Sequence, residues 1–262
     1  MKNIFALAGT AIIVCSFAAA QDNGERVVVP APPGGHPRQL NVHTLNGAIL
    51  VKAYGGSDVI VEAGSGSHHA ASSGGMHRLD VPRGLSIEEE DNVIKVHAEP
   101  NLPGPLTISV PVETSVNLHT LNGPLTVQGL HGEVDADTLA GRIELTDISG
   151  TVVAHTLNGG IHVTMDRVDP SKPLSFSSLN GSIDVTLPAD VKANLKFKTM
   201  RSDIYSDFEI ALGGSAPMEK DNGSGMKFRL RFDDHFEGVI NGGGVPAGFY
   251  TLHGTIYLRK KK

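Results

Sequence analysis

The fold of this chain is decided by residues 116–163, which read VNLHTLNGPLTVQGLHGE, VDADTLAGRIELTDISGT and VVAHTLNGGIHV on an 18-residue alignment. This alignment places a Thr-Leu-Asn/Ala-Gly phrase in one column, at residues 120–123, 138–141 and 156–159. Apolar residues keep the same interval before and after the phrase. A repeat this regular specifies a stacked architecture before it specifies any chemistry.

Each repeat predicts two short β-strands with a corner between them. Apolar and polar residues alternate on both sides of the phrase, as they do in half-buried strands. Asn and Gly tolerate left-handed backbone angles, so we expect the corner there, with Asn158 in the left-handed region. The residues to which this pattern assigns a structural role at corners are Asn46, Gly47, Asn122, Gly123, Gly141, Asn158, Gly159, Asn180 and Gly181.

Two folds satisfy this pattern: a series of β-hairpins with Asn-Gly turns, and a parallel β-solenoid whose coils stack about 4.8 Å apart. Only the solenoid uses the 18-residue constancy, because stacked coils place like residues above one another. Asn122 and Asn158 can then form amide ladders flanking Ala140. A second corner is indicated by Gly132 and Gly150. We therefore predict an all-β fold, a single parallel β-solenoid of short coils with Asn-Gly corners.

The phrase occurs seven times in all, with further copies at residues 44–47, 178–181, 199–202 and 251–254. We expect the outer copies to cap the array. Residues 85–112 alternate like irregular coils of the same stack, and residues 213–234 form an excursion with one strand. The predicted organisation is a signal peptide over residues 1–20, a Pro-rich extended segment over 21–38 and one repeat domain over 39–260.

The signal peptide has a positive residue, an apolar stretch and a small-residue cleavage site after Ala20. Its apolar stretch is shorter than the roughly 20 residues that a spanning helix needs. Val14 before Cys15 disfavours a lipoprotein signal. Cleavage would remove the only cysteine, so disulfides and cysteine chemistry are excluded from the mature chain.

Several of these features occur together in one known family. The repeated T-L-N-G coils, the secretory leader, the first copy LNVHTLNGAILV (40–51) and the closing NGGG and TLHGTIYLRK (241–260) resemble the bacterial putative adhesin family, a domain of unknown function. The resemblance covers residues 39–260. It implies a parallel β-solenoid at the cell envelope and, by analogy, surface binding.

Charge and motifs exclude several classes of function. The chain carries 28 acidic and 22 basic residues, for a formal net charge of −6, which opposes a nucleic-acid partner. Four basic residues at 259–262 are interpreted as a solvated tail in preference to a contact with anionic lipid or cell-wall polymer. No motif for nucleotide binding, acyl transfer or zinc-dependent proteolysis occurs. We expect no cofactor.

Aspartates and histidines are the remaining candidates for chemistry. Asp135, Asp137 and Asp147 could supply the carboxylate pair of a polysaccharide-active β-helix enzyme, either a glycan hydrolase or a lyase. His119, Asp137 and His155 recur at 18-residue intervals and form a legitimate set of metal ligands. Stacked coils would separate the two histidines by about 9.6 Å, so we interpret the column as a surface ladder and expect no metal site.

The favoured interpretation is a non-catalytic, exported module of the cell envelope that is periplasmic, surface-exposed or secreted. Candidate partners are cell-surface or cell-wall polymers and envelope proteins, with no nucleic acid and no transmembrane span in the mature chain. The alternative is the polysaccharide-active enzyme. Regular stacking without a visible concave site favours the structural or binding module.

Overall fold

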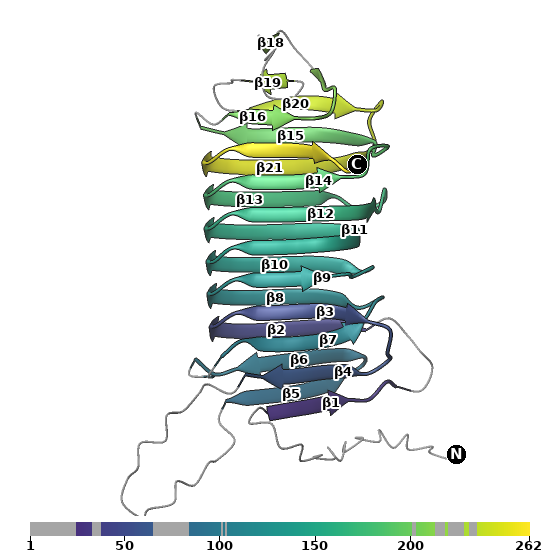
Figure 1. Cartoon of the computed structure of the whole chain (residues 1–262), viewed down its shortest axis with the longest axis vertical. Coiled ribbons are helices and arrows are strands. Elements are labelled where there is room, and N and C mark those ends of the chain that lie inside the picture. Colours follow the sequence, from purple (N-terminus) through teal and green to yellow (C-terminus); the bar gives the residue numbers. More distant parts are fainter. Residues whose placement is uncertain are drawn as a thin grey trace, which may run out of the picture.

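The computed structural model describes residues 25–32, 38–64, 84–100, 102, 104–200, 203–212, 218–219, 228–230 and 235–262. None of these residues is helical, so this part of the chain contains no helix that could cross a membrane. The strands lie in two facing layers stacked along one long axis (Figure 1). The predicted signal peptide, its cleavage after Ala20 and most of the 213–234 excursion lie outside the described residues.

Layer 1 contains the strands that carry the first half of each repeat. They pair in the order β5 (Leu85–Glu90), β6 (Val93–Ala98), β2 (Gln39–Asn46), β8 (Ser115–Asn122), β10 (Glu133–Ala140), the second half of β11 (Ile143–Asn158), β13 (Leu174–Asn180), β21 (Val245–His253), β15 (Ala193–Thr199), β20 (His235–Ile240) and β17 (Ala211–Leu212). Pairing is parallel from β6 to β15 and antiparallel beyond.

Layer 2 contains the strands that follow the corners. They pair in the order β1 (Glu25–Val29), β4 (Val59–Ala63), β7 (Leu106–Pro111), β3 (Ile49–Tyr54), β9 (Leu125–Gln128), the first half of β11, β12 (Ile161–Val168), β14 (Ile183–Leu187), β22 (Ile256–Lys260), β16 (Ile204–Ser206), β19 (Phe228–Leu230) and β18 (Met218–Glu219). Pairing is parallel from β7 to β16 and antiparallel beyond.

The fold is therefore all-β and solenoid-like, but the prediction of a single parallel stack is wrong at both ends. Antiparallel strands flank the parallel centre in each layer. Antiparallel neighbours need only a tight turn, such as Asp91 and Asn92 between β5 and β6, whose φ angles are 49° and 66°. Short reversed strands make the edge of each layer less regular, and this disfavours unwanted pairing with another chain.

In the parallel centre, the 18-residue alignment is the strand register. Val134 lies opposite Val116 on one side and Val152 on the other, and the threonines of the phrase align in the same way. The predicted stacking of like residues is confirmed here. A hairpin meander would not give this register, because its neighbouring strands run in opposite directions.

The first and last copies of the phrase lie inside the stack, so the prediction that they are caps is wrong. β2 and β3 are inserted between β6–β7 and β8–β9, while β21 and β22 lie between β13–β14 and β15–β16. Figure 1 accordingly places the C-terminus beside the stack rather than at its end. Aromatic packing accompanies this order, since the Phe249 ring stacks on Phe176 at 5.2 Å and on Phe197 at 5.0 Å.

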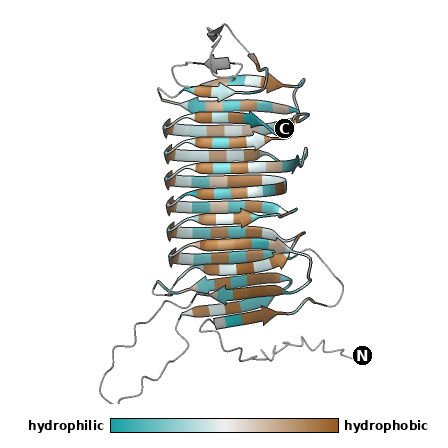
Figure 2. Cartoon of the chain, viewed as in Figure 1, coloured by the Kyte–Doolittle hydropathy of each residue, from teal (hydrophilic) through white to brown (hydrophobic). Residues whose placement is uncertain are grey.

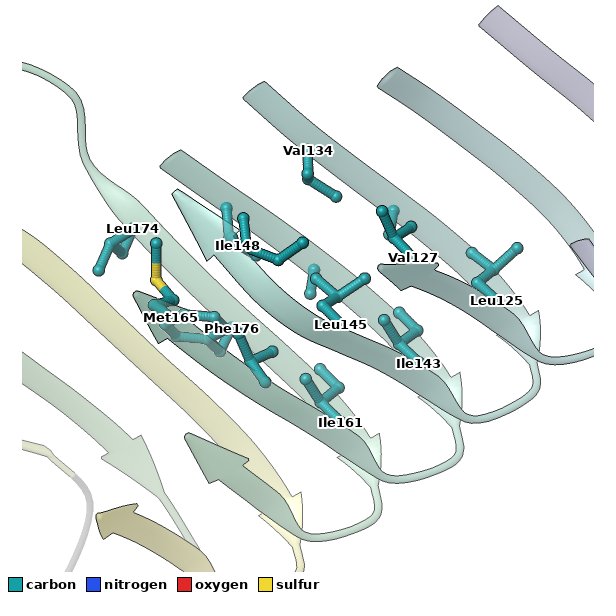
Figure 3. Close-up of a cluster of buried hydrophobic side chains, with 14 of the residues drawn as sticks. Leu125, Val127, Val134, Ile143, Leu145, Ile148, Ile161, Met165, Leu174 and Phe176 are labelled. Atoms are coloured by element: carbon teal, nitrogen blue, oxygen red, sulfur yellow. The ribbon is translucent and has the colours of Figure 1, made fainter. Parts of the chain in front are cut away.

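The core is the space between the two layers, filled by alternate residues of every strand. Apolar and polar residues alternate along the strands in Figure 2. Leu125, Ile143 and Ile161 occupy one column of successive coils, as Figure 3 shows, and at most 1 % of each is exposed. Burying such a side chain contributes about 1.5–3 kcal/mol, so the repeated columns are the main source of stability.

Close stacking of backbone, rather than a left-handed asparagine, shapes the Asn-Gly corner. Of the residues predicted at the Asn-Gly corners only Gly47 and Gly123 have left-handed φ angles, at 119° and 148°, and at the second predicted corner Gly150 has one of 138°. The prediction for Asn158 is wrong, because β11 continues through this residue. A Cβ atom on Gly159 would lie 1.9 Å from the carbonyl oxygen of Gly141 in the neighbouring coil, so only glycine fits.

Side chains of the phrase tie neighbouring coils together. The buried hydroxyls donate hydrogen bonds of 2.8–3.3 Å to corner carbonyls of the neighbouring coil, in the pairs Thr138–Gly123, Thr156–Gly141, Ser178–Gly159 and Thr251–Gly181. Asn122 donates to Asn46 at 3.0 Å, and Asn180 donates to Asn158 at 2.8 Å. Ala140 interrupts the amide column, so it consists of separate pairs on either side.

Residues at both ends of the repeats contact the stack. Part of the predicted extended segment 21–38 is β1, which pairs with β4. Arg38, the last residue of that segment, is buried and contacts Glu89 of β5 at 2.9 Å. At the other end Arg259 lies in β22 and donates to Asp184 at 2.7 Å. The interpretation of residues 259–262 as a solvated tail is wrong for the first three, because Arg259 and Lys260 belong to β22 and Lys261 donates from its backbone to Leu187 O at 2.8 Å, while Lys262 is exposed.

Candidate functional site

One outward column of layer 1 gathers imidazole rings and a carboxylate. Registered strands place its members on five consecutive rungs, in the order His97 (β6), His43 (β2), His119 (β8), Asp137 (β10) and His155 (β11). Their chain neighbours point into the core, so these side chains point to solvent. We call this set the histidine–aspartate column.

Asp137 holds the two histidines that flank it. Its Oδ2 lies 3.0 Å from Nδ1 of His119, and its Oδ1 lies 3.0 Å from Nδ1 of His155. An ionised carboxylate only accepts hydrogen bonds, so both rings must carry their proton on Nδ1.

His43 is stacked between two other imidazoles. Its ring centroid lies 4.8 Å from that of His119 and 5.6 Å from that of His97, with interplanar angles of 7° and 8°. Burial lowers the pKa of His43, and electrostatic repulsion from the neighbouring imidazoles of His119 and His97 lowers it further. The column therefore resists full protonation at this rung.

A shallow, open depression of about 600 Å³ lies over the first rungs of this column. Its lining offers amide, hydroxyl, carboxylate, ammonium and imidazole groups, from residues including Asn41, Asn117, Ser86, Glu88 and Lys95. Such a mixed set of donors and acceptors can bind a polar ligand through hydrogen bonds, but it does not enclose one.

Asp135 adds a second carboxylate to the outward face of β10, two residues before Asp137. It lies opposite Asn117 of β8 and Val153 of β11. Burial raises its pKa, Asp137 raises it further, and His119 opposes both effects. The two carboxylates of β10 are thus electrostatically coupled on one face of the strand.

The three aspartates considered for glycan cleavage do not converge. Asp135 and Asp137 lie on β10 in layer 1, whereas Asp147 lies at a bulge of β11 in layer 2, with φ of 55° and a side chain 66 % exposed. Asp137 is already held by two histidines. A glycosidase needs two carboxyl groups on opposite sides of one substrate bond. The polysaccharide-active alternative therefore has no support in this arrangement.

The metal candidates His119, Asp137 and His155 are brought together as a hydrogen-bonded row. Among the residues that the structure describes, no three His, Cys, Asp or Glu side chains are placed to hold one metal ion. Asp137 lies between the two histidines and takes one Nδ1 on each oxygen. The Nδ1 atoms of His119 and His155, which face Asp137, are thus already used in contacts with its carboxylate.

Two members of the column, His43 and His97, were missed by sequence reasoning. His43 precedes the first phrase just as His119 precedes the central one, so the constant offset could have found it. His97 lies in a segment without the phrase, and only the β6–β2 pairing brings it into the column.

Fold and site together define a β-solenoid-like repeat protein with a polar outward ladder. The family model described as Toastrack DUF4097 matches residues 10–225. The chain belongs to this family, a domain of unknown function, which agrees with the resemblance to adhesin-like proteins noted from the sequence. A search of curated proteins finds no match.

Two solved structures resemble this chain along most of its length. A putative cell adhesion protein from Clostridium sporogenes is 9 % identical, with a TM-score of 0.44, covering 91 % of this chain and 100 % of its own. A putative adhesin from Bacteroides fragilis is 12 % identical, with a TM-score of 0.41, covering 91 % of this chain and 98 % of its own.

Proposed function

We propose that this protein is an exported, non-catalytic binding module of the cell envelope. In this proposal residues 1–20 are a signal peptide cleaved after Ala20, and the repeat domain is a β-solenoid that presents layer 1 to a cell-surface or cell-wall polymer. The corner asparagines and glycines serve stability alone, since their contacts are made between coils. No metal or cofactor takes part.

The observation that carries the proposal is the state of the histidine–aspartate column. Its only carboxylate is engaged by His119 and His155, and the depression beside it is shallow and open. A catalytic site would place an acid and a nucleophile around one bond and exclude water from them. A row of outward donors and acceptors instead suits repeated, weak hydrogen bonds to an extended polar chain.

The test is a pull-down of glycans and isolated cell-wall material with the purified chain, recording the bound fraction and any released sugar ends together. We expect binding without hydrolysis. His43→Ser combined with Asn117→Ser should weaken binding. The matched control is His162→Ser, which removes a half-exposed outward histidine from layer 2.

Three results would contradict the proposal: release of sugar ends, unchanged binding by the layer 1 variant, or equal loss in the control. Export is tested separately by fractionating cells and sequencing the N-terminus of the exported protein. An N-terminus far from Gln21, or retention in the cytoplasm, would remove the envelope part of the proposal while leaving the binding part open to the pull-down.

A further inference from the structure

A row of outward apolar side chains runs beside the histidine–aspartate column. It consists of the second residue of each phrase, in stack order Leu45, Leu121, Leu139, Leu157, Leu179, Leu252 and Met200. We call it the leucine ridge. Among the residues that the structure describes, six large apolar side chains are exposed, and four of these six belong to the ridge.

Nothing in the fold of one chain requires leucine at this place. At four rungs the preceding threonine or serine is buried and bonded to a corner carbonyl of the neighbouring coil. Asparagines that follow the leucines form pairs, and the glycine avoids a backbone clash. Leucine alone points away from these contacts. Stacking along the ridge leaves Leu121 37 % exposed, Leu139 46 % and Met200 58 %.

The dimensions of the ridge limit what can cover it. Seven rungs spaced by about 4.8 Å span roughly 29 Å in a straight line. Seven partly exposed side chains present roughly 400 Å² of apolar surface, a size that is often functional on a monomer. A partner must offer apolar groups at the same spacing over the same length, and the ridge of a second copy meets both conditions.

We propose that two copies of this chain associate ridge to ridge, in antiparallel directions, about a two-fold axis near Leu157. Pairing the two ridges would bury roughly 800 Å², and their polar borders would bring the total towards the roughly 1,200 Å² of small, reversible interfaces. Such an interface is self-complementary, as a two-fold axis requires. It goes beyond the ligand binding proposed above and is centred on the ridge rather than on the histidine–aspartate column.

Charges beside the ridge decide between the two possible directions. Arg142 and Lys198 lie three and two residues from ridge positions. In a parallel pair each rung would meet the same rung of the partner, so each of these cations would lie at the height of its own copy, which repels. An antiparallel pair places Arg142 against Ser182 and Lys198 against His43, so it avoids both like-charge contacts at neutral pH.

Sedimentation velocity over a concentration series tests the association with the full chain. We expect the weight-average sedimentation coefficient of the wild type to rise with concentration. Leu121→Ser, Leu139→Ser and Leu157→Ser together should hold it at the monomer value. Val153→Ser is the matched control, because Val153 is also 37 % exposed but lies off the ridge, and it should behave like the wild type.

A wild type that stays monomeric at all concentrations, or a triple variant that associates like the control, would overturn the proposal. If circular dichroism shows that the triple variant is unfolded, Leu139→Lys alone supplies the same comparison at the most exposed leucine. A wild type that is monomeric but captures apolar ligands on the ridge would also overturn it.

Disulfide trapping tests the direction of the pair, in a chain that carries Cys15→Ser. Leu157→Cys should form a covalent dimer readily, because the two-fold axis brings this residue opposite its own copy. Leu45→Cys should not, because antiparallel pairing separates the two copies of this end rung by roughly the length of the ridge. Ready trapping through Leu45→Cys would refute the antiparallel arrangement.

Discussion

Replacing Gly159 by alanine tests whether the corners are held by close backbone stacking. The Cβ atom would lie 1.9 Å from the carbonyl oxygen of Gly141, against roughly 3.4 Å for an ordinary contact, so the coils must separate locally by about 1.5 Å. That shift strains two hydrogen bonds of 3.1 Å, from Gly141 N to Asn158 O and from Thr156 Oγ1 to Gly141 O.

The expected cost combines these effects. Forcing a methyl group into a packed site costs about 1–3 kcal/mol, and each weakened hydrogen bond adds about 0.5–1.5 kcal/mol. We therefore expect Gly159→Ala to lower the free energy of unfolding by about 2–6 kcal/mol. For a domain of this size the thermal midpoint should fall by about 4–24 °C.

The neighbouring residue provides a matched control. A Cβ atom on Gly160 meets nothing closer than Ser182 O at 3.5 Å, and Gly160 has no left-handed φ angle. Gly160→Ala should therefore be neutral or stabilise by up to about 1 kcal/mol, because alanine restricts the unfolded chain. Both variants are compared by urea unfolding and by thermal melts. Equal stability of the two variants would refute the stacking argument.

Three further predictions concern the polar columns. Changing His119, Asp137 and His155 together to Ser should keep thermal stability within about 1 kcal/mol and leave no specific response to Zn²⁺; a saturable Zn²⁺-dependent rise in the wild-type midpoint that the triple variant loses would contradict this. Asn158→Val should cost about 0.5–1.5 kcal/mol in urea unfolding through one lost amide bond, and no cost would deny the bond any role. Since the folded pKa of His43 is lowered, the unfolded state binds more protons below about pH 6.5, so the midpoint should fall from pH 7 to 5, and His43→Asn should flatten that slope.

Local pattern was enough to predict the repeating unit. Alternation identified the strands, and the 18-residue interval aligned Val116, Val134 and Val152 as the structure does. Both signals are short-range, because side chains alternate along any strand and like residues stack in parallel coils. Corner geometry was predicted less well. A glycine next to Asn158 indicates a turn, but whether it serves a left-handed angle or a close approach depends on the coil beside it.

The order of the coils was decided only by the tertiary structure. Units with the same columns can stack in many orders, so position in the sequence did not reveal that the first and last copies lie inside the stack. Complementarity between distant strands selects the order, as when Phe249 fits between Phe176 and Phe197. The same long-range pairing assembled the histidine–aspartate column by placing His97 beside His43. The sequence by itself thus determined what each coil looks like, and packing between coils determined which ones are neighbours.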